Sequence, residues 1–318
     1  MTVPSSKLKV VLEPAIEDHD PALYHAKVEY APVAGWEAVD DARIEEYRTR
    51  GFLVIRQAFS ASQIEAARVA LESITRSEAP QCKSMVYEGT IAGHLQHPCP
   101  PERPKRGART RGEVLEGLPC IDAGLRAGYV RKISDFCAAY PPLQALATQG
   151  EMLSVLGRIV GEPAVLFQEM ALVKPPGGRE KPWHQDHAYF DYPLETPIVG
   201  VWIAIDQVDV ENGCMVVLPG GHLQGPRLHF MRRDYQICDS DMQQVTEQQR
   251  LALPMEPGDL MLFDGKLPHG TPTNKTAGQR WAVQYHYVGE RARVVENKEA
   301  GEEGDSRPFG SEGKNATC

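Results

Sequence analysis

His184 and Asp186 lie two positions apart in the stretch Trp183-His-Gln-Asp186. On a β-strand, residues i and i+2 point to the same face, so an imidazole nitrogen and a carboxylate oxygen at this spacing can reach one ion together. In a chain with ten histidines, a single pair of this kind is more often a surface histidine beside an aspartate. A metal site therefore needs a third ligand from elsewhere in the chain.

The histidines that follow this pair differ in their surroundings; they are His187, His222, His229, His269 and His286. His187 is either a substrate contact or acid/base group, or an imidazole of the site wall or surface. His222 follows a Pro-Gly-Gly turn and resembles a turn residue, and His229 lies in a polar stretch without a supporting partner. His269 ends a strand-like segment, with Thr271 on the same face if the strand continues. His269 is therefore the candidate third ligand.

Arg280 opens the last predicted strand, after a polar turn at 274–278. A hairpin over this turn would bring Arg280 close to His269 and Thr271. Two histidines and one carboxylate on one face leave metal positions open, which is the pattern of non-haem Fe(II) oxygenases. Those positions can take a bidentate 2-oxo acid and O2, and arginine offers a two-pronged partner for a second, distant carboxylate. An arginine in a sheet core is otherwise costly, which disfavours a purely structural salt bridge.

Six motifs occur in a fixed order over roughly residues 45 to 290. They are Arg131–Phe136, Met170–Pro176, Trp183–Asp186, Gly200–Ala204, Glu211–Cys214 with Leu218–His222, and His269–Thr276 with Arg280. With these motifs the chain resembles the phytanoyl-CoA dioxygenase family of Fe(II)/2-oxoglutarate-dependent oxygenases. Six motifs in order are far more specific than any single one.

The resemblance implies a role for eight residues. It assigns Fe(II) binding and catalysis to His184, Asp186 and His269, and contacts to the cosubstrate 2-oxoglutarate to Arg280, Thr271, Trp202, Met170 and Lys132. Gln168 shares a strand face with Met170, so we expect it to reach the same pocket. Strand alternation places Trp202 on one face with the small Gly200 and Ala204, which would leave room for a ligand. Without the resemblance, plain core packing would explain Trp202 and Met170, and a solvated side chain would explain Lys132.

The resemblance also implies the reaction. With Fe(II), 2-oxoglutarate and O2, such an enzyme hydroxylates an unactivated C–H bond, and succinate and CO2 are coproducts; desaturation or ring formation are alternatives. We expect a small metabolite or secondary-metabolite scaffold as substrate. An acyl-CoA 2-hydroxylase of the phytanoyl-CoA type is the alternative. A metal hydrolase, or a non-catalytic binding module on the same fold, is the rival from another class.

Helical patterns precede strand patterns along the chain. Ser60 begins a helix with a capping box to Gln63, and a second helical region spans 143–160. Short apolar runs then recur at Ala164–Val173, Ile198–Ile205, Cys214–Leu218, Leu260–Phe263 and Trp281–Val288. Many short strands with Gly and Pro turns indicate a sandwich or barrel. The fold class that the resemblance implies is mainly β, a double-stranded β-helix (jelly roll, cupin-like) with helices packed on the larger sheet.

We expect a single domain over 1–318. It comprises an irregular lead-in (1–44), a helix-rich part (45–162), the jelly-roll core (163–290) and a polar flexible tail (291–318). Residues 77–128 match no part of the family pattern. Their basic run at 103–111 could bind the phosphates of a CoA thioester, but such a run is more often a solvated loop.

Composition excludes several classes of partner. With 34 basic and 43 acidic residues the net charge is −9, which argues against nucleic acid. The longest apolar run, eight residues at 198–205, is far short of the roughly 20 that span a membrane. Seven cysteines without a CxxC motif favour reduced thiols and a cytoplasmic location. We therefore expect a small-molecule substrate and a monomer or weak homo-oligomer.

Overall fold

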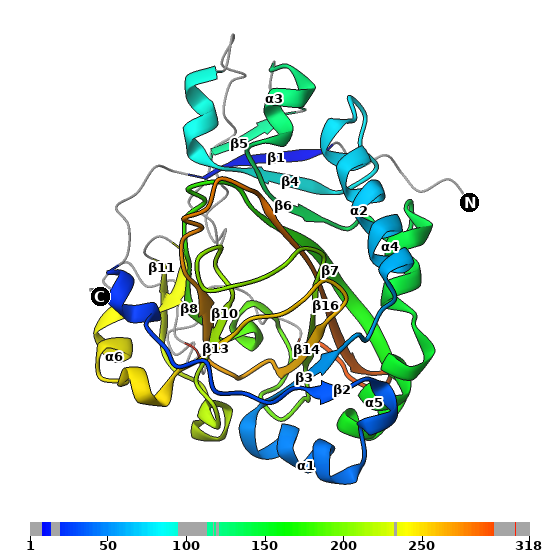
Figure 1. Cartoon of the computed structure of the whole chain (residues 1–318), viewed down its shortest axis with the longest axis vertical. Helices are drawn as coiled ribbons and strands as arrows, with labels where there is room; N and C mark the ends of the chain where they lie inside the picture. Colours follow the sequence, from blue (N-terminus) through cyan, green and yellow to red (C-terminus); the bar gives the residue numbers. More distant parts are fainter. Residues whose placement is uncertain are drawn as a thin grey trace.

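The computed structural model describes residues 8–13, 20–94, 113–116, 118, 121–231, 234–295 and 309. Two β-sheets face each other (Figure 1). The ten-stranded sheet runs in the order β2 (Val33–Ala34), β3 (Phe52–Arg56), β14 (Leu260–Asp264), β9 (Val199–Ala204), β16 (Arg280–Gly289), β7 (Ala164–Lys174), β6 (Val130–Ser134), β4 (Ser84–Tyr87), β1 (Lys9–Leu12), β5 (Glu113–Glu116). The four-stranded sheet runs β13 (Leu251–Leu253), β10 (Met215–Val217), β15 (His269–Thr271), β8 (Lys181–His184), and β11 (His229–Met231) pairs with β12 (Tyr235–Ile237). The predicted jelly roll is confirmed.

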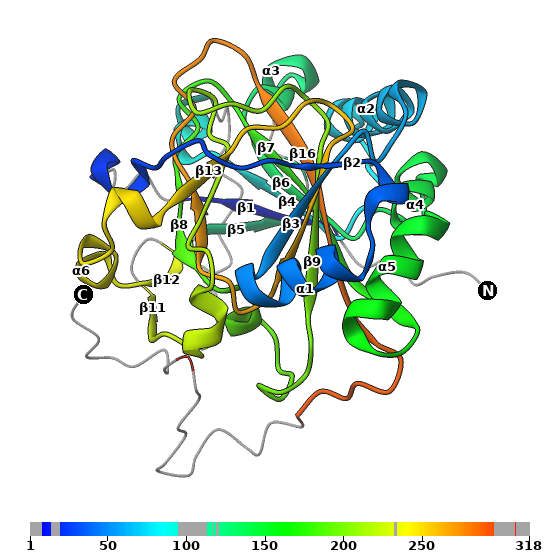
Figure 2. The ribbon, with the colours of Figure 1, turned by 60° about the horizontal axis from the view of Figure 1, so that its bottom comes forward.

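Helices cover the outer face of the large sheet. They are α1 (Asp41–Arg50), α2 (Ala61–Arg76), α4 (Pro141–Ala147) and α5 (Gly150–Val160), with α3 (Ala123–Ala127) beside α2. Figure 2 shows α2, α4 and α5 on one side of the molecule, and α6 (Asp239–Gln243) with β11 and β12 on the other. Short 3-10 turns complete the chain: η1 (Pro21–Tyr24), η2 (Trp36–Ala38), η3 (Gly89–His94), η4 (Asp186–Tyr189), η5 (Gly221–Gln224) and η6 (Glu247–Gln249). No helix in the described part of the chain is long and apolar enough to cross a membrane.

Helix α2 follows the sequence pattern closely. The Ser60 side chain accepts from the Gln63 backbone N–H, and the Gln63 side chain accepts from the Ser60 N–H, so the predicted capping box is present. Leu71 and Ile74 are fully buried on the sheet side, and each contributes about 1.5–3 kcal/mol relative to an exposed side chain. The N-terminal cap adds about 1 kcal/mol.

The predicted helical region at 143–160 is two helices. The Gln149 side chain accepts from the backbone N–H of Met152 at 2.6 Å and so caps α5. This places Gln149 itself in an extended conformation that ends the continuous helix. Gly161, at φ 82°, terminates α5 as expected.

Strand β16 presents alternate residues to opposite faces of the large sheet. Tyr285 and Tyr287 point to the helices and donate to the backbone oxygens of Leu143 and Ala147, at 2.7 and 2.6 Å. The bond to Ala147 satisfies a carbonyl group at the end of α4, where the helix offers no partner. The even-numbered residues of β16 therefore face the interior between the sheets, and this direction matters for the site.

Strand β9 confirms the predicted faces but corrects the role of one glycine. Val201 and Ile203 pack in the helix-side core, and Trp202 and Ala204 pack between the sheets. A Cβ on Gly200 would lie 2.2 Å from Cζ of Phe263. The space beside Gly200 is therefore filled by the Phe263 ring and holds no ligand.

Three further expectations are corrected. Lys9–Leu12, within the expected irregular lead-in, forms β1 between β4 and β5. β15 and β16 lie in different sheets, so residues 272–279 cross the sandwich and form no hairpin. Phe309, in the expected flexible tail, is buried and its carbonyl accepts from the N–H of His229 at 2.6 Å. The basic run at 103–111 lies outside the described residues.

The cysteines among the described residues divide into two groups. Cys82, Cys137 and Cys214 are free thiols, as expected. Cys238 is disulfide-bonded, so the expectation of reduced thiols throughout the chain is wrong at this position. The other cysteines lie outside the described residues.

Candidate active site

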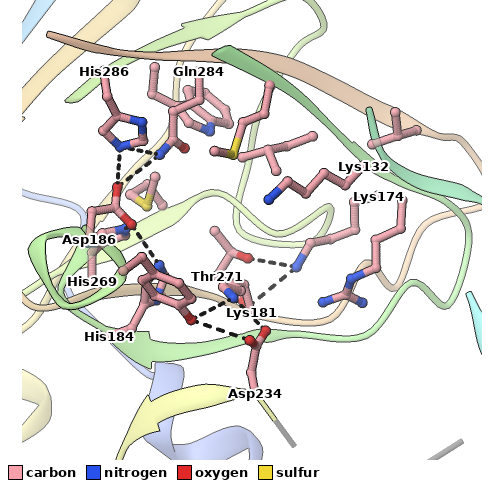
Figure 3. A pocket seen from close by; sticks show the side chains of 18 of the residues that line it. Lys132, Lys174, Lys181, His184, Asp186, Asp234, His269, Thr271, Gln284 and His286 are labelled. Carbon is pink, nitrogen blue, oxygen red and sulfur yellow. Dashed lines mark hydrogen bonds and ion pairs between the residues drawn. The ribbon is translucent and has the colours of Figure 1, made fainter. Parts of the chain in front are cut away.

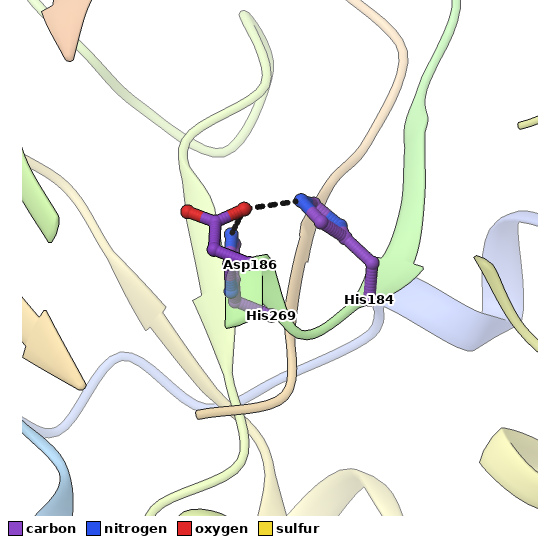
Figure 4. A group of neighbouring side chains, drawn as sticks. All are labelled: His184, Asp186 and His269. Atoms are coloured by element: carbon purple, nitrogen blue, oxygen red, sulfur yellow. Dashed lines mark ion pairs between the residues drawn. The ribbon is translucent and has the colours of Figure 1, made fainter. Parts of the chain in front are cut away.

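Three buried side chains meet where β8 ends and the neighbouring strand β15 begins. His184 ends β8, Asp186 begins η4, and His269 begins β15, where it pairs directly with His184 across the two strands. Oδ1 of Asp186 lies 3.2 Å from Nε2 of His184 and 3.7 Å from Nε2 of His269 (Figure 4). One ligand atom from each residue falls within 4.8 Å of the others. The spacing is close enough for all three to bind one ion.

The hydrogen bonds of the two histidines fix which ring nitrogen faces the carboxylate. Nδ1 of His184 lies 2.7 Å from the carbonyl oxygen of Pro182, and Nδ1 of His269 lies 2.9 Å from that of Leu267. Because a carbonyl oxygen only accepts, both Nδ1 atoms carry the proton in the neutral rings, and both Nε2 atoms present a lone pair. Two lone pairs and a carboxylate that converge in a buried place fit a cation, so the donor set is suited to a divalent metal.

The protonation of these residues is suited to metal binding. Burial, reinforced by His184, lowers the pKa of His269 to about 4. Burial alone would raise the pKa of Asp186, but the neighbouring imidazoles of His269 and His286 hold it well below its usual range. At neutral pH the carboxylate is therefore ionised and His269 is neutral, which are the forms that bind a metal.

A cavity of about 150 Å³ opens beside the three side chains, between the two sheets. All nine residues singled out in the sequence line it, including Met170, Lys132 and Gln168. Oε1 of Gln168 has no hydrogen-bond partner among the described residues. The structure thus brings the predicted site together, while the individual roles stay predictions.

Arg280 lies in this cavity as a buried guanidinium without a carboxylate partner among the described residues. It is 3% exposed, its Nη2 donates to the backbone oxygen of Gly213 at 3.2 Å, and its Nε and Nη1 have no partner. The guanidinium lies 5.3 Å from the centre of the Trp202 ring, which favours the cation. Burial lowers the pKa of Arg280 to about 10, so the group stays charged at neutral pH and fits an incoming carboxylate.

Lys174 is a site residue that the sequence reasoning missed. It pairs with Arg280 across β7 and β16, and its Nζ donates to Oγ1 of Thr271 at 2.8 Å and to the oxygen of Pro272 at 2.5 Å (Figure 3). Burial, and then the charge of Arg280, places the pKa of Lys174 well below its usual range. Two basic side chains and a hydroxyl therefore lie together at this end of the cavity.

The remaining charged wall of the cavity is internally paired. Glu13, which follows β1, contacts Arg131 at 3.0 Å and Arg179 at 2.6 Å. Lys181 contacts Asp234 at 2.5 Å. Arg131 also contacts Glu88 at 3.0 Å, so the charges of this wall are largely paired, and Lys132 is left without an ion-pair partner among the described residues.

The structure also revises two of the other histidines. Nε2 of His229 accepts the backbone N–H of Gln185 at 2.9 Å, so His229 has the partner that the sequence did not reveal. The Gln185 side chain donates to the backbone oxygens of Gly225 and Lys266. His187 is buried, does not line the cavity and stacks on Phe309. His229 thus holds the segment that carries two of the candidate ligands, and His187 belongs to the packing around it.

Comparisons with known proteins show the family and the fold of the chain. The model of the phytanoyl-CoA dioxygenase (PhyH) family matches residues 47–282. Peroxisomal phytanoyl-CoA dioxygenase of Bos taurus is 28% identical over 267 residues, which cover 79% of this chain and 68% of the relative. Methylphosphonate hydroxylase of Gimesia maris is 30% identical over 252 residues, which cover 78% of this chain and 80% of the relative. The solved structure of EvdO2 from Micromonospora carbonacea, complexed with 2-oxoglutarate, has a TM-score of 0.58 at 24% identity and covers 86% of this chain and 97% of its own.

Proposed function

The chain belongs to the phytanoyl-CoA dioxygenase family and is a 2-oxoglutarate-dependent non-haem iron dioxygenase, and we propose that it hydroxylates an unactivated C–H bond of a small metabolite. One observation carries the proposal. The buried donor set of His184, Asp186 and His269 shares a cavity with Arg280, a buried arginine that lacks a carboxylate partner among the described residues.

We assign the metal to the three converging side chains. His184 and His269 provide Nε2 and Asp186 provides Oδ1, and the carbonyl groups of Pro182 and Leu267 keep both rings oriented. Bound Fe(II), with 2-oxoglutarate and O2, supplies the oxidising chemistry, in which the cosubstrate becomes succinate and CO2. A metal hydrolase with the same ligands would have no use for the buried Arg280.

Arg280 and Thr271 hold the distal carboxylate of 2-oxoglutarate in this proposal. The two unpartnered N–H groups of Arg280 provide a fork for it. Lys174 donates to Oγ1 of Thr271, so the Thr271 hydroxyl must point its own hydrogen elsewhere and is free to donate to a ligand. The face of Trp202 supports the guanidinium, and Met170, Lys132 and Gln168 complete the pocket around the cosubstrate.

A small metabolite fits the described wall better than an acyl-CoA does. The nucleotide end of CoA carries phosphates, which would need unpaired cations. Within the described residues, Glu13 contacts both Arg131 and Arg179, Arg131 also contacts Glu88, and Lys181 contacts Asp234, which leaves Lys132 as the unpaired cation of this wall. The relative from Gimesia maris, a methylphosphonate hydroxylase, also supports a compact substrate.

A substrate screen tests the proposal. Purified protein is incubated with Fe(II), 2-oxoglutarate and panels of small metabolites and acyl-CoA thioesters, and succinate release is measured. We expect a small metabolite to stimulate succinate release and to gain one oxygen atom, which comes from ¹⁸O2. If only acyl-CoA thioesters stimulate succinate release, the substrate is an acyl-CoA and the proposed class of small metabolites is wrong. Turnover of a substrate without 2-oxoglutarate would refute the reaction itself.

A further inference from the structure

Two buried side chains of β16, Gln284 and His286, contact Oδ2 of Asp186. Nε2 of His286 lies 2.8 Å from Oδ2 of Asp186, and Nε2 of Gln284 lies 2.9 Å from the same atom (Figure 3). His286 is 1% exposed and Gln284 is 4% exposed. Neither residue belongs to the set that the sequence singled out for metal or cosubstrate.

Both contacts must be donations to the carboxylate. An ionised carboxylate only accepts, so the Gln284 amide presents its NH2 group and His286 carries a hydrogen on Nε2. The contact between Nε2 of Gln284 and Nε2 of His286, at 3.1 Å, is then an approach of two donors that share one acceptor. The chemistry of Asp186 therefore fixes the orientation of both side chains.

The two oxygens of Asp186 consequently have different surroundings. Oδ2 faces the two donors from β16, whereas Oδ1 faces Nε2 of His184 and of His269. We infer that Gln284 and His286 are positioning residues that restrict Asp186 to metal binding through Oδ1 alone. A carboxylate that swung to bind through both oxygens would occupy a position that the cosubstrate or O2 needs. This inference rests on the proposed metal site.

The packing around β16 keeps both donors in place. Phe190 and Phe263 lie edge-on to the His286 ring, with centroids 5.0 and 6.3 Å away. Gln284 pairs with Met170 of β7 on one side and with Trp202 of β9 on the other, in the middle of the large sheet. Donors on a central strand, with packed side chains around them, hold a ligand more firmly than donors on a loop.

Metal binding by the full-length protein, with Co(II) as the probe, tests the inference without a substrate. Co(II) is titrated anaerobically into apo protein, and both the dissociation constant and the visible ligand-field spectrum are recorded. We expect Gln284→Leu and His286→Leu each to weaken Co(II) binding about 10- to 100-fold, the range typical for loss of such a partner. The ligand-field spectrum should also change, because the Asp186 carboxylate is no longer restricted to binding through Oδ1. His286→Gln restores an N–H near the position of Nε2 and should bind within about threefold of wild type.

Matched variants separate this role from general loss of folding. His222→Leu and Gln236→Leu remove buried side chains of the same types that do not line the cavity, and they should leave Co(II) affinity and spectrum unchanged. His184→Ala reports on the metal site itself and should abolish binding. Wild-type binding by His184→Ala would overturn the proposed site. Loss of binding there, with Gln284→Leu and His286→Leu unchanged in affinity and spectrum, would overturn the positioning role alone. Equal losses in the matched controls would also overturn it. Should His286→Leu fail to fold, Gln284→Leu decides the outcome.

Discussion

Replacement of Arg280 by methionine removes the two buried N–H groups that have no partner among the described residues. A hydrogen bond to a charged group contributes about 1.5–3 kcal/mol, and removal of one partner of a buried ion pair costs about 3–5 kcal/mol. A loss of about 3 kcal/mol, at about 1.4 kcal/mol for each factor of ten, weakens 2-oxoglutarate binding about 100-fold. Arg280→Lys keeps the charge but loses the fork, so we expect a smaller loss that is still measurable.

The assay is an anaerobic titration of the Fe(II)-loaded protein with 2-oxoglutarate, and in parallel with 2-oxobutanoate, which lacks the distal carboxylate. Wild type should prefer 2-oxoglutarate strongly, and Arg280→Met should bind the two compounds with similar affinity. The melting temperature of apo Arg280→Met should not fall below that of wild type. The wild-type guanidinium has no ionic partner among the described residues, so the substitution breaks no ion pair. A loss of less than threefold for 2-oxoglutarate, or an equal loss for both compounds, would refute the reasoning.

Three further changes have distinct expected results. Thr271→Val removes the hydroxyl proposed to contact the distal carboxylate of 2-oxoglutarate. In the same titration it should weaken 2-oxoglutarate binding about tenfold, the effect of losing one hydrogen bond. Gly200→Ala forces a Cβ against Phe263 and should lower stability by about 1–3 kcal/mol in thermal melts, whereas Gly278→Ala, which meets nothing within 4 Å, should leave it nearly unchanged. Burial lowers the pKa of His229 to about 3, so the unfolded chain takes up a proton that the folded state resists. Stability should therefore fall as the pH drops from about 6.5 towards 3, and His229→Gln should show a shallower fall in melting temperature over that range.

Strand alternation accounts for most of what the sequence predicted about the site. The placement of Trp202 between the sheets follows from the period of two along a strand. Strand β8 ends at His184 and Asp186 begins η4, but Gln185 between them is extended, so the alternation that the sequence predicts continues through it. The same rule, extended from Arg280 along β16, places Gln284 and His286 on the face of the site. That alternation is the signal in the sequence that places both residues there.

Other features depend on contacts between segments far apart in the chain. In the sequence, Lys174 resembles the last residue of a strand. Its pairing with Arg280 and its hydrogen bond to Thr271, seen only in the structure, show that it belongs to the site. The hydrogen bond from Gln185 to His229 joins residues 44 positions apart, so no local pattern reveals it. Glu13, directly after β1, lies in the wall of the cavity, although the composition of this segment predicted an irregular lead-in. Tertiary contacts of this kind leave no period in the sequence.

The central claim is that one cavity holds both the metal and 2-oxoglutarate. The most direct measurement is an anaerobic titration of apo protein with Fe(II) and then 2-oxoglutarate, followed by the metal-to-ligand absorption band. Wild type should develop the band, and His184→Ala and Arg280→Ala should fail to do so at the same concentration of 2-oxoglutarate. Wild-type protein that binds the metal and shows no band would contradict the claim, as would an undiminished band in both variants.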